Sequence, residues 1–300
     1  MENNYHVPVM LEEVIEGLKI KPSGIYVDCT FGGGGHSKAI LDKLDENGLL
    51  IVFDQDEDAF INAYKDPRLI FVPNNFRHIK RFLRLNKIEQ VDGVLADLGV
   101  SSHQFDEGSR GFSIRFDAQL DMRMDQRQTV TAADILNKYP ADKLQKIFEQ
   151  YGEVTNSKTL AATIVTARLQ TPFSSINSFK DAIYSIVKGN PNKYLAQVFQ
   201  ALRIEVNEEL VALQELLTQL PEVLSENGRA VIITFHSLED RLVKNFFKTG
   251  SFEEIEVDLF GNRKTTPFNL ITKKPLTAND EELKRNPRSR SAKIRIAEKN

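Results

Sequence analysis

Four consecutive glycines, Gly32 to Gly35, constrain this 300-residue chain more than any other feature of its sequence. They follow a short apolar run that contains Asp28, and a helix-like segment begins after them at Ser37. Glycine loses more backbone freedom on folding than any other residue, so the run indicates positive φ or close approach of a ligand to the main chain. At the end of a first strand, it marks the place where α/β folds bind nucleotides. A flexible loop without a ligand is the alternative, which the regular patterns on both sides disfavour.

Strand and helix patterns alternate on both sides of the glycines. Apolar residues at helical spacing indicate a helix over 10–18. The strands predicted next are 25–29, 49–53, 69–72 and 91–97, and the helices between them are 37–45, 57–65 and 77–86. These strands are almost continuously apolar, as expected for a parallel sheet that is buried on both faces. The sequence therefore predicts an α/β fold with a doubly wound, Rossmann-like sheet.

The alternation stops after residue 105 and returns only near residue 229. In between, the predicted elements are helices over 131–151 with a break at Pro140, 156–170, 178–188 and 193–218. A strand over 229–235, a helix over 238–248 and an antiparallel pair, 252–258 with 292–297, complete the pattern. We therefore expect a sheet domain in two parts, 1–104 and 196–300, interrupted by an all-helical, substrate-recognition domain over 105–195.

The composition excludes several classes of protein. The formal net charge is −3 and the isoelectric point is about 6.0, so a nucleic-acid site would have to be a local basic patch. The single cysteine, Cys29, excludes an internal disulfide and a cysteine-rich metal site, and we expect no metal. No apolar run approaches the length of a membrane span, and the first residues show no signal-peptide pattern. We expect a cytoplasmic protein without membrane contact.

Two acids end predicted strands and are candidates for chemistry. Asp54 follows the second strand, where a carboxylate accepts hydrogen bonds from both ribose hydroxyls of a nucleotide. A helix cap is the alternative for Asp54 and the favoured role for Asp56. Asp97 ends the fourth strand, where amino-methyltransferases line the junction between cofactor and target, and it is our candidate catalytic residue. The alternative for Asp97 is a loop cap.

The nucleotide is identified by the rest of the sheet. The spacing Gly32-x-Gly34-x-x-Ser37 nearly satisfies the dinucleotide fingerprint, and by itself it permits an NAD-dependent oxidoreductase. A dinucleotide enzyme needs a second mononucleotide-binding half, but here the sheet resumes only after the helical insertion and ends in a strand pair. One half with a reversed terminal strand indicates a class I methyltransferase that uses S-adenosylmethionine. The Asp/Asn-Pro-Pro-aromatic tetrapeptide, common among enzymes that methylate exocyclic amines, is absent.

Motifs along the whole chain resemble the RsmH (MraW) family of bacterial small-subunit ribosomal RNA cytosine-N4 methyltransferases. They are Tyr5-His6-x-Pro8-Val9-Met10-Leu11, Thr30-Phe31-Gly32-x-Gly34-Gly35-His36-Ser37, Asp97-Leu98-Gly99-Val100-Ser101-Ser102-x-Gln104, Arg110-Gly111-Phe112-Ser113, Leu120-Asp121-Met122-Arg123-Met124-Asp125, Phe235-His236-Ser237-Leu238-Glu239-Asp240-Arg241 and Asn286-Pro287-Arg288-x-Arg290-Ser291. Gly33 stands where some members of the family carry arginine.

The resemblance implies an activity and a set of cofactor contacts. The activity is methyl transfer from S-adenosylmethionine to the N4 amine of a cytidine in 16S ribosomal RNA, in the decoding region of an assembled or nearly assembled small subunit. A non-catalytic RNA-binding assembly factor with the same fold is an alternative, and a homodimer stays open. The implied cofactor contacts are Gly34, Gly35, His36, Asp54, Phe76, Asp97 and Gln104, with Phe76 placed to pack against adenine.

RNA contacts would come from local basic residues. Lys284, Arg285, Arg288, Arg290, Lys293 and Arg295 are clustered near the end of the sequence, where a solvated strand edge is the alternative. A second cluster over 77–84 is better explained as the outer face of a helix. Phosphate contacts give affinity and salt dependence, whereas a base splayed into a site gives sequence choice. Our substrate-binding candidates are His6, Arg123, His236, Arg288 and Arg290, and ion pairing or helix capping is the alternative for Arg123 and His236.

Overall fold

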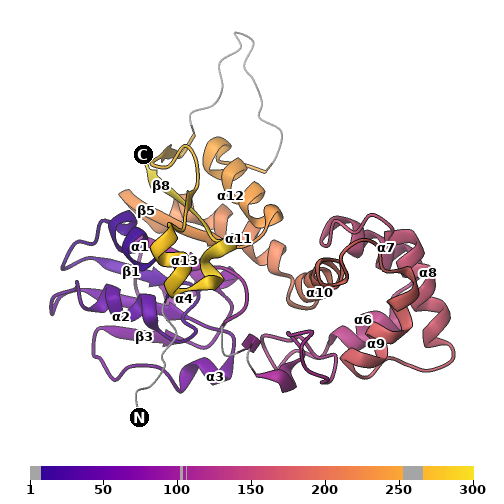
Figure 1. The fold of residues 1–300 in the computed structure, drawn as a ribbon. Coiled ribbons are helices and arrows are strands. Elements are labelled where there is room, and N and C mark those ends of the chain that lie inside the picture. Colours follow the sequence, from indigo (N-terminus) through magenta and orange to yellow (C-terminus); the bar gives the residue numbers. More distant parts are fainter. Residues whose placement is uncertain (1–7, 102–103, 106, 253–265) are drawn as a thin grey trace, which may run out of the picture. The chain divides into compact units, whose positions relative to one another are not determined.

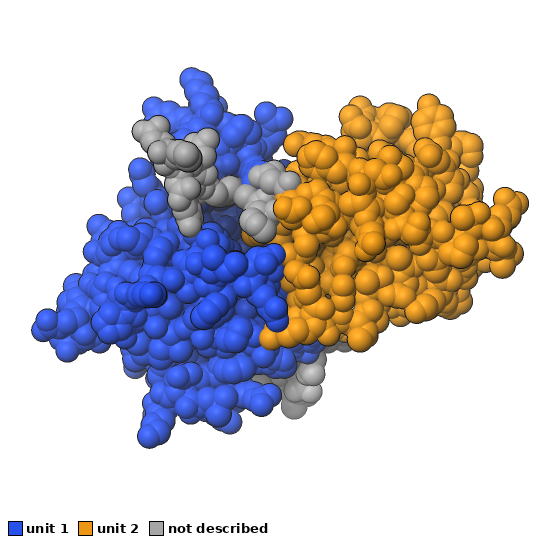
Figure 2. Space-filling model, turned by 90° about the horizontal axis from the view of Figure 1, so that it is seen from below, with its two compact units in different colours: residues 1–99, 210–300 blue, residues 100–209 orange. Residues whose placement is uncertain are grey.

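The computed structural model describes residues 8–101, 104–105, 107–252 and 266–300. The chain forms two compact units (Figure 2). Unit 1 consists of Met1–Gly99 with Leu210–Asn300, and unit 2 is Val100–Glu209. Among the described residues, no helix is long and apolar enough to cross a membrane.

Unit 1 contains one mixed sheet (Figure 1). Its strands are β1 (Ile25–Asp28), β2 (Leu49–Phe53), β3 (Leu69–Val72), β4 (Val91–Asp97), β5 (Leu224–Thr234), β6 (Phe268–Leu270), β7 (Leu276–Thr277) and β8 (Lys293–Lys299). The order is β3-β2-β1-β4-β5-β8-β6, with β7 also pairing with β8. Neighbours from β3 to β5 are parallel, and β8 is antiparallel to β5, β6 and β7. The strand order reverses between β1 and β4, which is where open α/β sheets bind ligands at the carboxyl ends of their strands.

Helices cover both faces of this sheet, which explains the continuous apolar runs of its strands. On one face, α1 (Leu11–Leu18), α2 (Gly35–Leu41) and α3 (Glu57–Phe60) share a core with Tyr26 and Leu50. On the other face, α4 (Ile79–Leu85), α11 (Glu209–Val223) and α12 (Ser237–Thr249) share a core with Val27 and Ile51. Neighbouring strand residues thus point to opposite cores, as the pleat requires.

Short elements complete unit 1. The 3-10 turn η1 (Phe76–His78) follows β3, and α13 (Asp280–Arg285) with η4 (Pro287–Ser291) precedes β8. The buried carboxylate of Glu282 on α13 accepts a hydrogen bond of 3.1 Å from the main-chain N–H of Met10, just ahead of α1. Segments from the two ends of the sequence therefore lie side by side in this unit.

Unit 2 is built from helices around its own apolar core. The helices are α6 (Ala132–Lys138), α7 (Ala141–Gln150), α8 (Ser157–Arg168), α9 (Ile176–Ile183) and α10 (Pro191–Asn207), with short 3-10 turns η2 (Gly108–Arg110) and η3 (Tyr184–Ile186). Thr131 begins α6 with a capping box, and Pro140 stands between α6 and α7, where the sequence predicts a break. The fold class predicted from the sequence is confirmed: a doubly wound sheet with an all-helical insertion.

Several expected boundaries differ from the observed ones. The single helix predicted over 193–218 is wrong, because Glu208 adopts a left-handed conformation with φ of 49° and separates α10 from α11. The segment before β8, expected as a basic loop, contains α13. The predicted strand over 252–258 lies outside the described residues from 253 onward.

The compact units also divide the chain at other residues than the expected domains, whose boundaries are 104/105 and 195/196. They divide it at 99/100 and 209/210. The second difference has a packing cause, because Val198, Phe199 and Leu202 of α10 belong to the core of unit 2.

Candidate cofactor and active site

The glycine loop joins β1 to α2, and Gly33, Gly34 and Gly35 differ in what a side chain would meet. Gly34 has φ of 77°, and a Cβ there would stand 2.7 Å from the Tyr64 hydroxyl. A Cβ on Gly35 would stand 3.0 Å from the Pro8 ring. A Cβ on Gly33 would meet no atom within 4 Å. Conformation and packing therefore require Gly34 and Gly35, while the main chain at Gly33 is open to a ligand.

Asp54 follows β2 and is held by main-chain amides. Its Oδ2 accepts 2.7 Å from Gly32 N–H, and its Oδ1 accepts 2.9 Å from Asp56 N–H. Burial raises the pKa of Asp54 to about 6; these two hydrogen bonds lower that pKa, and the charges of Asp56 and Asp28 raise it. Asp56 caps α3 by accepting from Asp58 N–H, as expected from the sequence.

Hydrogen bonds tie the end of β4 to the end of β1. The main-chain N–H of Asp97 donates 2.7 Å to the Thr30 hydroxyl oxygen, and the N–H of Thr30 donates 3.0 Å to Oδ1 of Asp28. The other oxygen of the buried Asp28 accepts 2.6 Å from the Ser37 hydroxyl. Both carboxylate oxygens of Asp28 therefore accept hydrogen bonds from the protein. Through Thr30, these bonds fix the position of Asp97 at the end of β4.

The side chain of Asp97 is less completely satisfied. Its Oδ1 is buried and has no hydrogen-bond partner among the described residues. Its Oδ2 lies 3.7 Å from Nδ1 of His36, which is longer than a hydrogen bond. Nε2 of His36 lies 3.0 Å from the Val9 carbonyl oxygen, so this nitrogen is the one that donates a proton. Burial raises the pKa of Asp97 to about 6; the charge of His36 lowers that pKa, whereas Asp28 and Glu239 raise it.

Two further residues hold the glycine loop and escape sequence reasoning. The Tyr64 hydroxyl donates 2.9 Å to the Gly34 carbonyl, and its ring packs edge-on against Phe31 with centroids 6.0 Å apart. The Asn62 amide lies at 3.5 Å from the Gly32 carbonyl. Both follow α3, in a segment that the sequence predicts as plain helix up to residue 65, although α3 ends at residue 60. No local motif marks them.

The model of the MraW methylase family matches residues 3–300. The chain belongs to this family. Membership confirms the resemblance in the sequence, and the chain is an S-adenosylmethionine-dependent methyltransferase. The alternatives of an NAD-dependent oxidoreductase and of a non-catalytic assembly factor are not supported.

Relatives of the family are similar over their whole length. The chain is 54% identical over 300 residues to the ribosomal RNA small subunit methyltransferase H of Bacteroides thetaiotaomicron, covering 99% of this chain and 98% of the relative. It is 56% identical over 298 residues to the protein of the same name from Parabacteroides distasonis, covering 98% and 97%. A methyltransferase of Streptococcus mutans solved in complex with SAH is 13% identical with a TM-score of 0.42, covering 98% of this chain and 100% of that chain. Because that score is low, the fold class rests on the sheet order above.

Side chains at the loop fit the cofactor of the MraW methylase family. The cofactor carries ribose hydroxyls, a methionine end and a positive sulfonium. Asp54 offers carboxylate oxygens that retain lone pairs for hydroxyls, and the main chain at Gly33 is open to a methionine end. The buried, unpartnered Oδ1 of Asp97 offers negative charge.

The two remaining family-implied contacts lie in different units. Phe76 begins η1 just after β3, and its ring is partly buried against the core under α4 and α11. Gln104 belongs to unit 2, where it is buried; its Oε1 accepts 3.0 Å from Ser101 N–H, and its own N–H donates 3.2 Å to the Ser101 hydroxyl. The roles of both residues toward the cofactor remain predictions.

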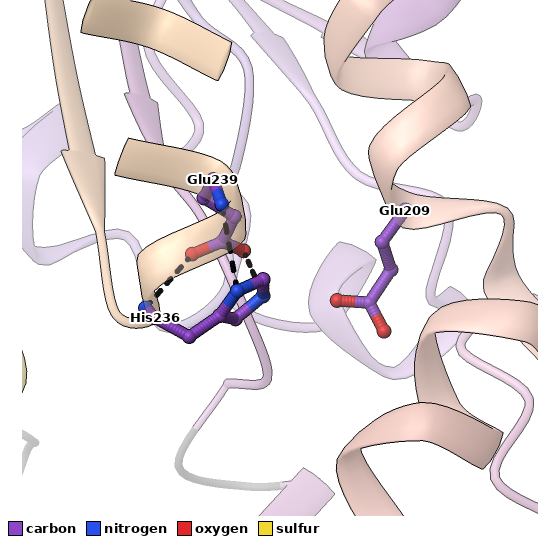
Figure 3. Close-up of side chains that lie close together, drawn as sticks. All are labelled: Glu209, His236 and Glu239. Carbon is purple, nitrogen blue, oxygen red and sulfur yellow. Dashed lines mark hydrogen bonds and ion pairs between the residues drawn. The ribbon is translucent and has the colours of Figure 1, made fainter. Parts of the chain in front are cut away.

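His236 caps α12 (Figure 3). Its Nδ1 accepts from Glu239 N–H at 3.4 Å, and its own N–H donates 3.3 Å to Oε2 of Glu239. Nε2 lies 3.1 Å from Oε1 of Glu239, yet the geometry gives no hydrogen bond, so this buried ring nitrogen lacks a hydrogen-bond partner among the described residues. Capping, one of the two roles considered from the sequence, is therefore present; a substrate role remains a prediction.

Arg123 is engaged within unit 2. Two of its nitrogens donate to the two oxygens of Asp121 at 2.7 Å each, and a third donates to the main chain at Gln128. This arrangement is the ion pairing considered from the sequence, and an RNA contact by Arg123 remains a prediction. His6 lies outside the described residues.

Intramolecular ion pairs occupy many of the basic residues of unit 1. On the helical cluster, Arg77 pairs with Glu215 at 2.6 Å and Lys80 pairs with Glu222, which supports the view of this cluster as a helix surface. Near the end of the sequence, the buried Arg295 pairs with Asp240 at 2.7 Å.

Arg288 and Arg290 are exposed on η4. An RNA contact by either arginine remains a prediction.

Proposed function

We propose that this methyltransferase transfers a methyl group to the exocyclic N4 amine of a cytidine in small-subunit ribosomal RNA, in the decoding region of an assembled or nearly assembled subunit. The observation that carries the proposal is the switch point of the sheet, where an open glycine main chain lies between the carboxylates that end β2 and β4. The names of the relatives, which are ribosomal RNA small subunit methyltransferases, support the choice of substrate. Such RNA lies in the cytoplasm, where we propose the enzyme acts.

The cofactor is held at the carboxyl edge of the sheet. Asp54 accepts hydrogen bonds from the ribose hydroxyls, and the main chain of Gly34 and Gly35 borders the methionine end. Phe76 packs against adenine at the end of β3. His36 and Gln104 complete the set that the family resemblance implies. Asp54 supports this role best, because main-chain amides fix the direction of both its oxygens.

The methyl donor supplies an activated carbon, bound to a sulfonium, for an in-line displacement. The N4 amine of cytosine is a weak nucleophile because its lone pair is delocalised into the ring. A carboxylate that accepts an N–H hydrogen bond returns electron density to that nitrogen. Asp97 serves as this acceptor through Oδ1, whose hydrogen-bonding capacity the described protein does not use. Alignment of the two reactants supplies much of the rate.

RNA is attracted by the exposed cations of η4 and selected by a base that leaves its stack. Replacing Arg288 and Arg290 by alanine should weaken RNA binding and reduce the slope of log affinity against log salt, because phosphate contacts release counterions. Cofactor affinity should not change. A paired replacement of Arg77 and Lys80, which are bound to acids of α11, is the control and should leave the salt slope unchanged. An unaltered slope in the Arg288 and Arg290 variant would remove η4 from the RNA site.

The decisive experiment maps the product. Small subunits purified from a strain that lacks this gene are incubated with the protein and labelled cofactor, and the RNA is digested and analysed by mass spectrometry. The expected product is one N4-methylated cytidine in the decoding region. Label in another base or at another atom would contradict the substrate, and subunit binding without label would contradict the assignment of the activity to this site.

A further inference from the structure

Three carboxylates gather where the strand order reverses. Asp28 ends β1, Asp54 follows β2, and Asp97 ends β4, and these strands are neighbours in the sheet. Parallel neighbours bring their carboxyl ends to one edge. The edge therefore concentrates negative charge at the place proposed for a cofactor that is positively charged.

The three acids differ in how the protein satisfies them. Each oxygen of Asp28 and Asp54 accepts a hydrogen bond from a main-chain amide or a hydroxyl. Asp97 has no such support for its buried Oδ1, and its Oδ2 faces His36 beyond hydrogen-bond distance. The Asp97 side chain is partly exposed, but its buried Oδ1 has no donor among the described residues, which makes ionisation costly and favours a ligand that brings positive charge.

The charged groups that act on Asp97 come from three other elements. His36 on α2 is the one base among them, and Asp28 on β1 and Glu239 on α12 are acids. His36 is itself oriented by the Val9 carbonyl, which fixes Nε2 as the donor and leaves Nδ1 toward Asp97. Two of these three groups are acids that disfavour ionisation of Asp97, and the contribution of His36 opposes them.

We propose that Asp97 is the residue by which the enzyme distinguishes the positively charged methyl donor from its neutral thioether product. The inference rests on the proposed cofactor site. Both molecules carry the same adenosine and the same amino acid end, so contacts to those parts do not separate them. Loss of the methyl group removes the sulfonium charge, and with it the attraction to Asp97. The product is then held by fewer interactions than the donor, which favours exchange after each turnover.

Protonation of Asp97 should weaken binding of the positively charged donor as the pH falls. The pKa of Asp97 stands at about 6 because of burial, so the carboxyl is largely ionised at neutral pH and largely protonated one unit below that pKa. A cation stabilises the ionised form and binds it preferentially. The ratio of donor to product affinity should fall on the order of tenfold between about pH 7 and about pH 5, which is the largest change expected when the bound cation lowers the pKa of Asp97 well below 5. Protonation of Asp54, whose pKa is also about 6, should weaken donor and product alike and cancel in this ratio.

The test is calorimetric binding of S-adenosylmethionine, S-adenosylhomocysteine and sinefungin, in which an ammonium replaces the sulfonium, across this pH range. The wild-type protein is compared with Asp97→Asn, Asp54→Asn and His36→Gln, and thermal unfolding at each pH confirms that the variants are folded. We expect the wild-type protein to prefer both cations increasingly as pH rises. Asp97→Asn should make the ratio of donor to product affinity independent of pH. Asp54→Asn should weaken donor and product alike and keep the pH dependence of their ratio.

Three outcomes would overturn the inference. The first is a wild-type ratio that does not change with pH. The second is an Asp97→Asn protein that keeps the wild-type dependence, and the third is a dependence that only His36→Gln abolishes, which would assign the effect to the histidine. Failure of the cofactor site is distinguishable, because Asp54→Asn and Asp97→Asn would then both leave all three affinities unchanged. The product map described above tests the reaction independently.

Discussion

β2 is followed by an aspartate and β4 ends in one, but the two carboxylates differ in the hydrogen bonds that they accept from the protein. At the end of β2, main-chain amides of Gly32 and Asp56 hold both oxygens of Asp54. At the end of β4, Asp97 is held through its main-chain N–H by Thr30, while its Oδ1 has no hydrogen-bond partner among the described residues. Burial raises the pKa of both acids to about 6. The fold therefore preorganises the carboxylate of Asp54, whereas Oδ1 of Asp97 is left to accept a contact from a bound ligand.

Asp54→Ala should give the largest change on the β2 side. It removes acceptors for the ribose hydroxyls, and unpaired partners cost about 1–3 kcal/mol, or roughly fivefold to more than a hundredfold in affinity for donor and product alike. Calorimetry with both ligands measures this. Asp56→Ala is the matched control, because it removes the cap of α3 and should lower stability while sparing affinity. An Asp54→Ala protein with wild-type affinity for both ligands would contradict the role of Asp54 as the ribose acceptor.

Gly34→Ala and Gly33→Ala form a pair that tests the loop between these ends. Alanine at Gly34 would adopt a left-handed conformation and press on the Tyr64 hydroxyl, so we expect a loss of about 1–2 kcal/mol in the free energy of unfolding. Alanine at Gly33 meets open space and should change it by less than about 0.5 kcal/mol. Urea titration of the cofactor-free protein measures both. Equal losses would contradict the division of roles within the loop.

Thr30→Val probes how the fold positions Asp97. It removes the hydroxyl that accepts from Asp97 N–H, which should cost about 1 kcal/mol in the free energy of unfolding and reduce the methylation rate more than donor affinity. Thr218→Val, at an exposed hydroxyl on α11 that bonds only within its own helix among the contacts described, is the control. If kcat is unaffected, the Thr30 contact does not place Asp97 for the reaction.

Tyr64→Phe should give the smallest effect. It keeps the ring against Phe31 and removes the hydroxyl that donates to the Gly34 carbonyl, so donor affinity should fall by a factor of about two to ten, as for loss of one ordinary hydrogen bond. KM for the donor should rise while kcat stays near the wild-type value. Tyr184→Phe, on a side chain that is 77% exposed, should have no effect. A lower kcat with unchanged KM would contradict a role in shaping the loop.

The sequence predicts where a residue stands relative to a strand, but not a contact that is made across the fold. The positions of Asp54 and Asp97 at strand ends could be predicted because each ends or follows an apolar run, and parallel strands bring their ends together. The roles of Gly34, Asp54 and Asp97 toward the cofactor remain predictions. Tyr64, Thr30 and Pro8 act through hydrogen bonds and packing between distant segments, which leave no local pattern. The break at Glu208 was missed for another reason, because a glutamate in the left-handed conformation has no propensity signal.

The long-range contacts of unit 1 have a consequence for translation. Unit 2 is one continuous stretch, so a ribosome finishes it before it makes β5, whereas the sheet of unit 1 waits for β8, which lies between β5 and β6. The hydrogen bond from the Met10 N–H to Glu282 likewise cannot form until residue 282 has been synthesised. A nascent chain thus emerges with its nucleotide loop already made and its sheet incomplete. Limited proteolysis of ribosome-bound chains halted before β8 should find the first strands still susceptible, and protection at that stage would show that the early strands fold without their final partner.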